Sequence, residues 1–278
     1  MSDLNIPCGE SIVRNILYGK KWFKEYFDLE CIHTAWFIDV FGYNAQMPQI
    51  LKQAGFKSLI ANRNPDNNGS DIVYKAKGID NSEIRVAEQI HFIRSQEDVN
   101  GFLEKIKINL KKNNNVFALA YTEDEHLPTK KVIKKINELD NNSKDEYIYS
   151  TPECYFKQIK KENIDLPEKS ADNNPIFSGT YTLRISLKLK NRQLENELLQ
   201  LEKFITCYYE KEVYNSYYKK IKQLWKKLIF VQFHDSLCGC NTYRVFKEIE
   251  SRHKTIENKI KKLKKEIYKK KSSKDDLA

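Results

Sequence analysis

The chain has 278 residues, of which 40% are hydrophobic and 12% aromatic, enough to build a folded core, so a disordered protein is excluded. Its formal net charge of +10, from 48 lysines and arginines against 38 acidic residues, admits nucleic acid or an anionic surface as a partner. The lysines are spread through ordinary amphipathic patterns, however, and we predict no nucleic-acid partner.

Helix-like and strand-like patterns alternate along the first part of the chain. Apolar residues at helical spacing predict a helix over 11–27, and a short apolar run predicts a buried strand over 35–41. A helix over 47–56, closed by Gly55, and a strand over 58–62 follow. This alternation predicts an α/β fold with a mainly parallel sheet, whose functional groups gather at the carboxyl ends of the strands.

The same alternation resumes further along. We predict a helix over 97–113, a strand over 115–124 that runs into acidic residues, and a helix over 128–140 with Pro128 in its first turn. The strand places Asp124 at its carboxyl end, as the strand over 35–41 does with Asp39.

The pattern changes after an Asn-, Ser- and Gly-rich loop over 168–182. Three long segments with apolar residues at spacings of three and four predict a helical bundle, over 184–211, 213–237 and 243–271. We therefore predict two domains, an α/β domain over 1–172 and a helical domain with a three-helix bundle over 173–278.

Cysteine usage and hydropathy indicate the compartment. The six cysteines form no Cys-x-x-Cys pair, and only Cys238 and Cys240 lie close together, so reduced thiols are expected. No apolar run reaches the length of a membrane span, and the first residues lack the pattern of a secretion signal. We predict a cytoplasmic protein without a membrane partner.

Two constellations of polar residues stand out against apolar surroundings. Asp39 is expected to be a buried carboxylate at a strand end, and His234 lies next to Asp235 in a segment that otherwise reads as core. Each has a structural interpretation: an acid that caps the following helix, and a histidine satisfied within the core. Each also has a functional one, because strand ends and helix ends are where catalytic and metal-binding groups gather.

The residues around Asp39 carry a resemblance to a known family. The shared positions are Trp36, Asp39, Phe41, Gly42, Pro48, Gly55 and Phe56. They resemble the signature of family 38 glycoside hydrolases, the α-mannosidases and bacterial relatives such as mannosylglycerate hydrolase. Further segments match in family order, namely CGESIVRNILYGKKWF, SGTYTLRISLKLKNRQLENELLQLE and QFHDSLCGC.

The resemblance implies a fold and a reaction. The fold would be an incomplete (β/α) barrel-like glycosidase domain followed by a helical bundle. The reaction would be zinc-dependent, retaining hydrolysis of α-mannosidic bonds in glycans or mannosylglycerate-like substrates, which needs two carboxylates roughly 5 Å apart.

The resemblance also implies roles for individual residues. Asp39 would be the nucleophile and a zinc ligand, and His234 a second zinc ligand. Asp124 would be the acid/base, although Glu123, Glu125 and His126 lie beside it in the sequence. The residues expected to bind or position the substrate are Asp235, Arg63, Trp36 and Phe41.

The chain also departs from the family pattern. None of its five histidines is followed two residues later by aspartate, so the His-x-Asp motif that supplies two further zinc ligands is absent from this sequence. We expect the chain to be cut at both ends relative to the family, without the first strand and the later β-sandwich domains. The alternative functions are an inactive fragment, a non-catalytic subunit that pairs with a second polypeptide carrying the missing segments, and a basic helical protein that binds anions.

Overall fold

The computed structural model forms two compact units. It describes residues 1–63, 72–88, 91–93, 101, 104, 120–122, 130–141, 149–170 and 176–275. The helical unit consists of Met1–Asp28 and Phe177–Ala278, and the sheet unit of Leu29–Ile176. The predicted domain boundary between residues 172 and 173 stays a prediction. In the structure, residues 1–28 belong to the same compact unit as the C-terminal helices.

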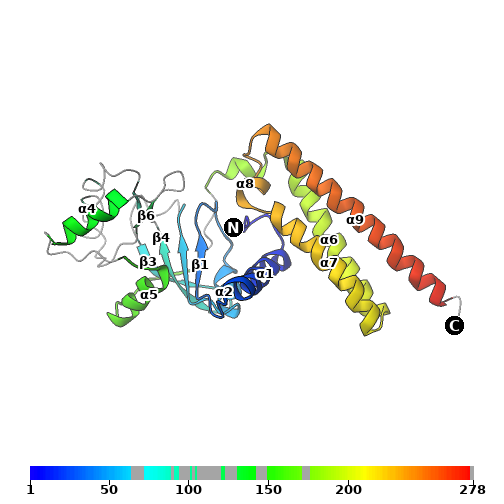
Figure 1. The fold of residues 1–278 in the computed structure, drawn as a ribbon, viewed down its shortest axis with the longest axis horizontal. Helices are drawn as coiled ribbons and strands as arrows, with labels where there is room; N and C mark the ends of the chain where they lie inside the picture. Colours follow the sequence, from blue (N-terminus) through cyan, green and yellow to red (C-terminus); the bar gives the residue numbers. More distant parts are fainter. Residues whose placement is uncertain are drawn as a thin grey trace. The chain divides into compact units, whose positions relative to one another are not determined.

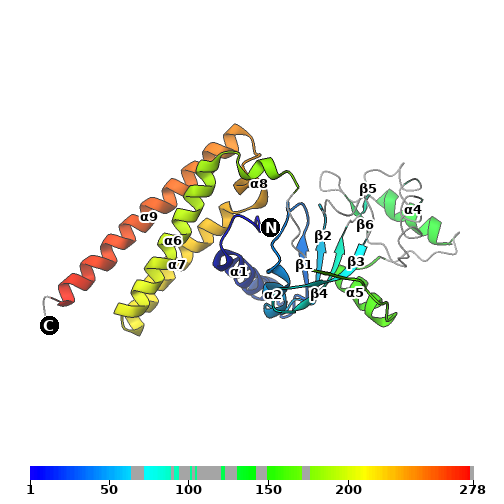
Figure 2. The same ribbon diagram turned by 180° about the vertical axis from the view of Figure 1, so that it is seen from behind.

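The sheet unit contains a five-stranded sheet in the order β1-β2-β4-β3-β7 (Figures 1 and 2). Its strands are β1 (Thr34–Phe37), β2 (Ser58–Ala61), β3 (Ile72–Lys77), β4 (Glu83–Glu88) and β7 (Glu168–Ser170). Only the β3 and β4 pair is antiparallel among these neighbours. A second, two-stranded sheet pairs β5 (His91–Ile93) with β6 (Ala120–Thr122) in parallel.

Two helices pack on the larger sheet. The described helices of this unit are α2 (Met47–Gln53), α4 (Lys130–Asn141) and α5 (Pro152–Lys161). Of these, α2 contacts β4 and α5 contacts β2. The α5 helix begins where the Thr151 side chain accepts a hydrogen bond from the Cys154 N–H, with Pro152 in the first turn. Its Phe156 and Ile159 pack on Ile60 of β2. Every residue of β2 is buried, as expected for a strand between two covered neighbours.

The β3 and β4 hairpin was not predicted from the sequence. Its turn is closed by the Gly78 N–H, which donates to the Ser82 carbonyl at 2.8 Å. Asn81 takes a left-handed φ of 64°, and the Asp80 carboxylate accepts the Ser82 N–H at 3.0 Å. Gly, Asp and Asn at a tight turn are the usual signal for a hairpin. The helix predicted over 97–113 and the strand predicted over 115–124 fall mostly outside the described residues.

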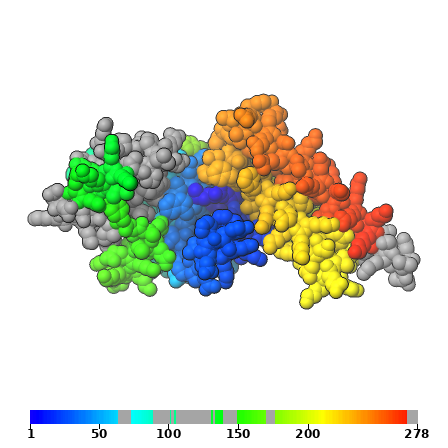
Figure 3. Space-filling view, viewed as in Figure 1, coloured from blue at the N-terminus to red at the C-terminus, as the bar shows by residue number. Residues whose placement is uncertain are grey.

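The described part of the helical unit contains three long helices, α6 (Ile185–Tyr208), α7 (Lys211–Val231) and α9 (Tyr243–Asp275). The helix α1 (Gly9–Phe27) precedes them in the sequence, the short helix η2 (Ser178–Tyr181) lies before α6, and the short helix α8 (His234–Leu237) lies between α7 and α9. Large apolar side chains at spacings of three and four form their shared core, including Leu194, Leu198, Leu201, Trp225, Leu228, Ile256, Ile260 and Ile267. Figure 3 shows the side chains of α7 and α9 closed against each other. The described helices α6, α7 and α9 share this core and form a helical bundle. No described helix is both long and apolar enough to cross a membrane.

The second predicted bundle helix, over 213–237, is broken at Gln232. The Gln232 carbonyl accepts the Asp3 N–H at 2.8 Å and the Ser2 hydroxyl at 3.1 Å. Its side-chain amide donates to Ser11 Oγ, Asn191 Oδ1 and Glu195 Oε1, at 3.2, 2.9 and 3.0 Å. These partners turn the chain out of α7 and start α8 at His234.

A buried histidine of α9 makes the stability of the helical unit sensitive to pH. His253 is 2% exposed, and neither ring nitrogen has a hydrogen-bond partner among the described residues. Burial, with a smaller contribution from Lys190, lowers the pKa of His253 to about 4, against an opposing effect of Glu250. The imidazole is therefore neutral in the folded chain at pH 7.

We expect acid to destabilise the chain through His253. Between pH 6.5 and 4 the unfolded chain binds a proton at this residue and the folded chain does not, so stability falls as the pH falls, by up to about 3 kcal/mol. His253→Leu should remove this part of the pH dependence, measured by urea unfolding at several pH values. His33→Gln, in the sheet unit, is the control. An unchanged pH slope in His253→Leu would contradict the assignment.

Gly239, in the turn after α8, allows a second prediction. Its φ is +85°, and an added Cβ would lie 2.8 Å from the Leu183 carbonyl oxygen and 2.8 Å from Lys188 Nζ. Gly239→Ala should destabilise the helical unit by about 2 kcal/mol or more, because backbone strain and a steric clash add. Gly19→Ala, within α1 and with nothing within 4 Å, should instead stabilise it by up to about 1 kcal/mol. Equal denaturation midpoints for the two variants would refute this reasoning.

Candidate active-site residues

Asp39 lies in the turn that follows β1. Its φ of 68° is left-handed, a conformation that aspartate and asparagine tolerate better than most residues. The Asp39 N–H donates to Asn62 Oδ1 at 2.6 Å, which ties the turn after β1 to the segment after β2. The side chain is 36% exposed. The prediction of a buried carboxylate is therefore wrong, because β1 ends at Phe37 and Asp39 projects from the turn beyond it.

Arg63 holds the Asp39 carboxylate. Its Nε donates to Asp39 Oδ1, and its Nη2 forms an ion pair with the same oxygen. The two residues meet because β1 and β2 are parallel and in register from Thr34 with Ser58 to Phe37 with Ala61, which brings their carboxyl ends to one edge. A half-exposed pair contributes about 1 kcal/mol or less to stability, so its main effect is to orient the carboxylate.

The two aromatic residues expected at the substrate differ in exposure. Trp36 lies on β1 with its side chain partly exposed, whereas Phe41 is buried within the unit. Their roles in substrate binding stay predictions.

Sequence reasoning missed a buried polar cluster at the carboxyl end of β4. Glu88, the last residue of that strand, is buried. Its Oε1 accepts hydrogen bonds from the hydroxyl groups of Tyr74 and Tyr43, the latter at 3.3 Å. Burial, followed by the effects of Tyr43 and Glu88, raises the pKa of the Tyr74 hydroxyl, which stays protonated as a donor. The acid that ends the strand EIRVAE was the available signal, of the same kind as Asp39.

His234 begins α8 in the helical unit. Its backbone N–H donates to the Met1 carbonyl at 3.2 Å, and its Nδ1 lies 3.4 Å from the same oxygen. If Nδ1 donates there, Nε2 is the lone-pair nitrogen, the arrangement found in metal-binding histidines. Nε2 lies 3.5 Å from Asp235 Oδ2. His234 is buried, while the Asp235 side chain is 52% exposed.

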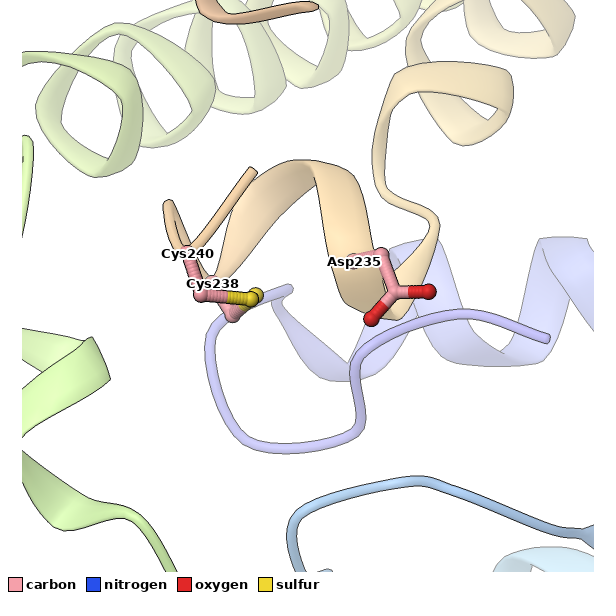
Figure 4. A group of neighbouring side chains, drawn as sticks. All are labelled: Asp235, Cys238 and Cys240. Atoms are coloured by element: carbon pink, nitrogen blue, oxygen red, sulfur yellow. The ribbon is translucent and has the colours of Figure 1, made fainter. Parts of the chain in front are cut away.

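The turn after α8 carries a cysteine pair. Cys238 is buried and Cys240 exposed, and their Sγ atoms lie 3.1 Å apart (Figure 4). Burial raises the pKa of the Cys238 thiol to about 12. Ligand atoms of Asp235, Cys238 and Cys240 all lie within 4.8 Å of one another, so this group could hold a metal ion.

Lys188 supports this turn from α6. Its Nζ donates to the carbonyl oxygens of Cys238 at 2.7 Å, Thr180 at 3.0 Å, and Leu183. Burial lowers the pKa of Lys188. The three carbonyls satisfy the donors of this buried ammonium and fix the conformation around Gly239.

The remaining predicted residues are placed only in part. Asp39 and Arg63 belong to the sheet unit, and His234 and Asp235 to the helical unit, each described by itself. The joint zinc site of Asp39 and His234 therefore stays a prediction. Asp124, with Glu123, Glu125 and His126, lies outside the described residues.

Comparison with family models covers nearly the whole chain. Residues 1–180 match the N-terminal domain of the glycosyl hydrolases family 38, and residues 175–270 match the alpha mannosidase middle domain.

Individual relatives agree. Alpha-mannosidase G of Dictyostelium discoideum is 28% identical over 268 residues, which is 91% of this chain and 24% of the relative. An alpha-mannosidase of Saccharomyces cerevisiae is 27% identical over 272 residues, 88% of this chain and 24% of the relative. A putative mannosylglycerate hydrolase of Halalkalibacterium halodurans is 24% identical over an alignment of 298 residues, which covers 92% of this chain and 32% of the relative. The chain thus spans about a quarter to a third of these relatives.

Solved structures confirm the predicted fold class. An alpha-mannosidase from Enterococcus faecalis superposes with a TM-score of 0.73 at 21% identity, over 97% of this chain and 33% of that structure. At this identity the likeness shows the fold alone, an α/β domain with a mainly parallel sheet followed by helices. Because the family model for the N-terminal domain spans 180 of the 278 residues, the chain belongs to glycosyl hydrolase family 38.

Proposed function

We propose that the chain contributes to retaining hydrolysis of α-mannosidic bonds, with Asp39 as the nucleophile. The observation that carries the proposal is the Asp39 carboxylate, oriented by Arg63 at the carboxyl edge of parallel strands in a family 38 domain. Relatives named as alpha-mannosidases and as a putative mannosylglycerate hydrolase support an α-mannoside as substrate, in glycans or in a small mannosylated compound.

The proposed reaction proceeds in two displacements. The Asp39 carboxylate attacks the anomeric carbon while Asp124, in its acid form, protonates the departing glycosidic oxygen. Asp124, now a base, then takes a proton from water, which attacks the same carbon and releases Asp39. Arg63 keeps the carboxylate oriented, and the exposed Asp235 contacts substrate hydroxyls.

Zinc is the proposed cofactor, held by Asp39 and His234. A carboxylate oxygen and a neutral imidazole nitrogen are donors that suit zinc, and the contact of Nδ1 with the Met1 carbonyl leaves Nε2 for the metal. Bound zinc would coordinate neighbouring hydroxyl groups of the sugar and help distort the sugar ring. Two ligands are fewer than the three protein ligands that a catalytic zinc usually has, so we expect weak binding unless further ligands are supplied.

The remaining expectations from the sequence stay predictions. A second polypeptide that carries a His-x-Asp motif would complete the set of zinc ligands. Without these further ligands we expect the chain to be non-catalytic. The cytoplasmic location is equally a prediction.

Asp39→Asn should reduce hydrolysis of an aryl α-mannoside by at least about 1000-fold, because the amide cannot act as the nucleophile. Asparagine tolerates the left-handed φ, so the fold should be kept. Asp28→Asn is the matched control, since Asp28 also has a left-handed φ, of 55°. The assay uses the 278-residue chain with zinc supplied. Equal turnover by native chain and Asp39→Asn would refute the assignment, and silence of both folded proteins would favour the non-catalytic alternative.

His234→Ala should weaken zinc binding at least tenfold, measured by calorimetry after metal removal with a chelator. Cys240→Ser tests the competing group formed by Asp235, Cys238 and Cys240, and should leave zinc affinity unchanged. If Cys240→Ser lost zinc and His234→Ala kept it, the metal would belong to the cysteine pair.

A further inference from the structure

The pair Cys238 and Cys240 differs from the other cysteines of the chain. All six are free thiols, and only these two make a sulfur-to-sulfur contact among the described residues. They project from a turn whose backbone is fixed on several sides. Lys188 binds the Cys238 carbonyl, and the Asn241 side chain donates to the carbonyls of Asp235 and Ser236, each at 2.9 Å.

The separation of the sulfurs favours a bond between them over a shared metal ion. A disulfide bond is about 2.05 Å long. Two thiolates on one tetrahedral zinc, each about 2.3 Å from the metal, would lie about 3.8 Å apart. The observed 3.1 Å is shorter than that, so the thiols face each other directly. Gly239, with its φ of +85°, supplies the backbone conformation that allows this.

The two thiols also differ in access to solvent. Cys240 is exposed and Cys238 is fully buried. An oxidant therefore reaches Cys240 first, and Cys238, whose Sγ lies 3.1 Å from Cys240 Sγ, is placed to resolve the product once its thiol gives up its proton. An exposed, nucleophilic thiol next to a resolving cysteine is the arrangement of reversible oxidation sites.

We propose that Cys238 and Cys240 form a site of reversible oxidation by low-molecular-weight disulfides. Cys240 loses its proton to solvent, and its thiolate attacks one sulfur of the external disulfide. This forms a mixed disulfide and displaces one thiolate, which takes up a proton from solvent. Cys238 Sγ then attacks Cys240 Sγ, and the proton of Cys238 passes to the second departing sulfur, which leaves as a thiol. The two cysteines lose two electrons and two protons in total, and the external disulfide becomes two thiols.

The consequence is local to the turn that follows His234 and Asp235. A disulfide bond between Cys238 and Cys240 closes a small ring that includes Gly239. The Cys238 carbonyl, which is part of that ring, accepts a hydrogen bond from Lys188 Nζ. Exposed or strained disulfides are the easily reduced ones, so the bond should reopen under a thiol reductant. The proposal stands independently of the glycosidase activity.

The test is oxidation of the reduced chain with glutathione disulfide, followed by maleimide labelling and peptide mass mapping. We expect the wild-type peptide spanning residues 238–240 to lose both labels together, to carry no glutathione, and to regain both labels after dithiothreitol. Cys207→Ser, which removes an exposed cysteine of α6, should behave at this peptide as the wild type does.

Single variants identify the order of events. Cys238→Ser should keep a glutathione adduct on Cys240, whereas Cys240→Ser should leave the buried Cys238 as a free thiol. Circular dichroism verifies that both variants fold, and the wild-type result stands without them. A lasting adduct on Cys240 in the wild type, or a peptide that stays fully reduced while Cys207 reacts, would overturn the proposal. So would protection of both thiols by equimolar zinc in the presence of glutathione disulfide.

Discussion

The carboxylate of Glu195 joins three segments of the helical unit, α6, the start of α1 and the end of α7. It is fully buried on α6, and its Oε1 accepts hydrogen bonds from the Cys8 N–H, the Ser11 hydroxyl and the Gln232 amide, at 2.9, 2.6 and 3.0 Å. Arg192, one turn earlier, pairs with Oε2 at 2.8 Å. Removing a charge-assisted partner from such a buried network is costly, because the groups that remain are left unsatisfied. Through Gln232 the same network ends α7, and the break places His234 and Asp235 at the start of a new helix instead of within the bundle core.

In the sheet unit, the backbone conformation positions the candidate residues, as the buried network does in the helical unit. Asp39 and Arg63 both have left-handed φ values, 68° and 67°, in the segments that follow two parallel strands. Such conformations cost energy and persist where the surroundings hold them, here through the Asn62 side chain and the ion pair. The Asp39 carboxylate lies in a turn, is 36% exposed and pairs with a guanidinium, so it can contact a substrate. A carboxylate buried within the strand could not.

The sequence predicted periodic elements well and local exceptions poorly. The helices α1, α2, α4, α6 and α9 and the strands β1 and β2 were predicted because their apolar residues keep a regular period. The end of α7 was missed because Gln232 and His234 occupy positions that fit a continuing helix, and the contacts that break it come from residues distant in the sequence, namely 2, 3, 11, 191 and 195. Arg63 was expected to bind or position the substrate from the family resemblance alone, and its contact with the Asp39 carboxylate is seen only in the structure. Glu88 was missed because its hairpin was not recognised, and the exposure of Asp39 was missed because the strand was predicted to end at residue 41, four residues beyond the end of β1.

Family membership and mechanism rest on different grounds. The first follows from matches that span the chain, and the second is our proposal for a chain about a quarter as long as its alpha-mannosidase relatives. In that mechanism the Asp39 carboxylate attacks the sugar. The most direct measurement treats the chain, with zinc supplied, with a fluorinated α-mannosyl donor whose covalent intermediate breaks down slowly, and locates the label by peptide mass mapping. We expect a label on Asp39 alone, and a label on any other residue would show that Asp39 is not the nucleophile.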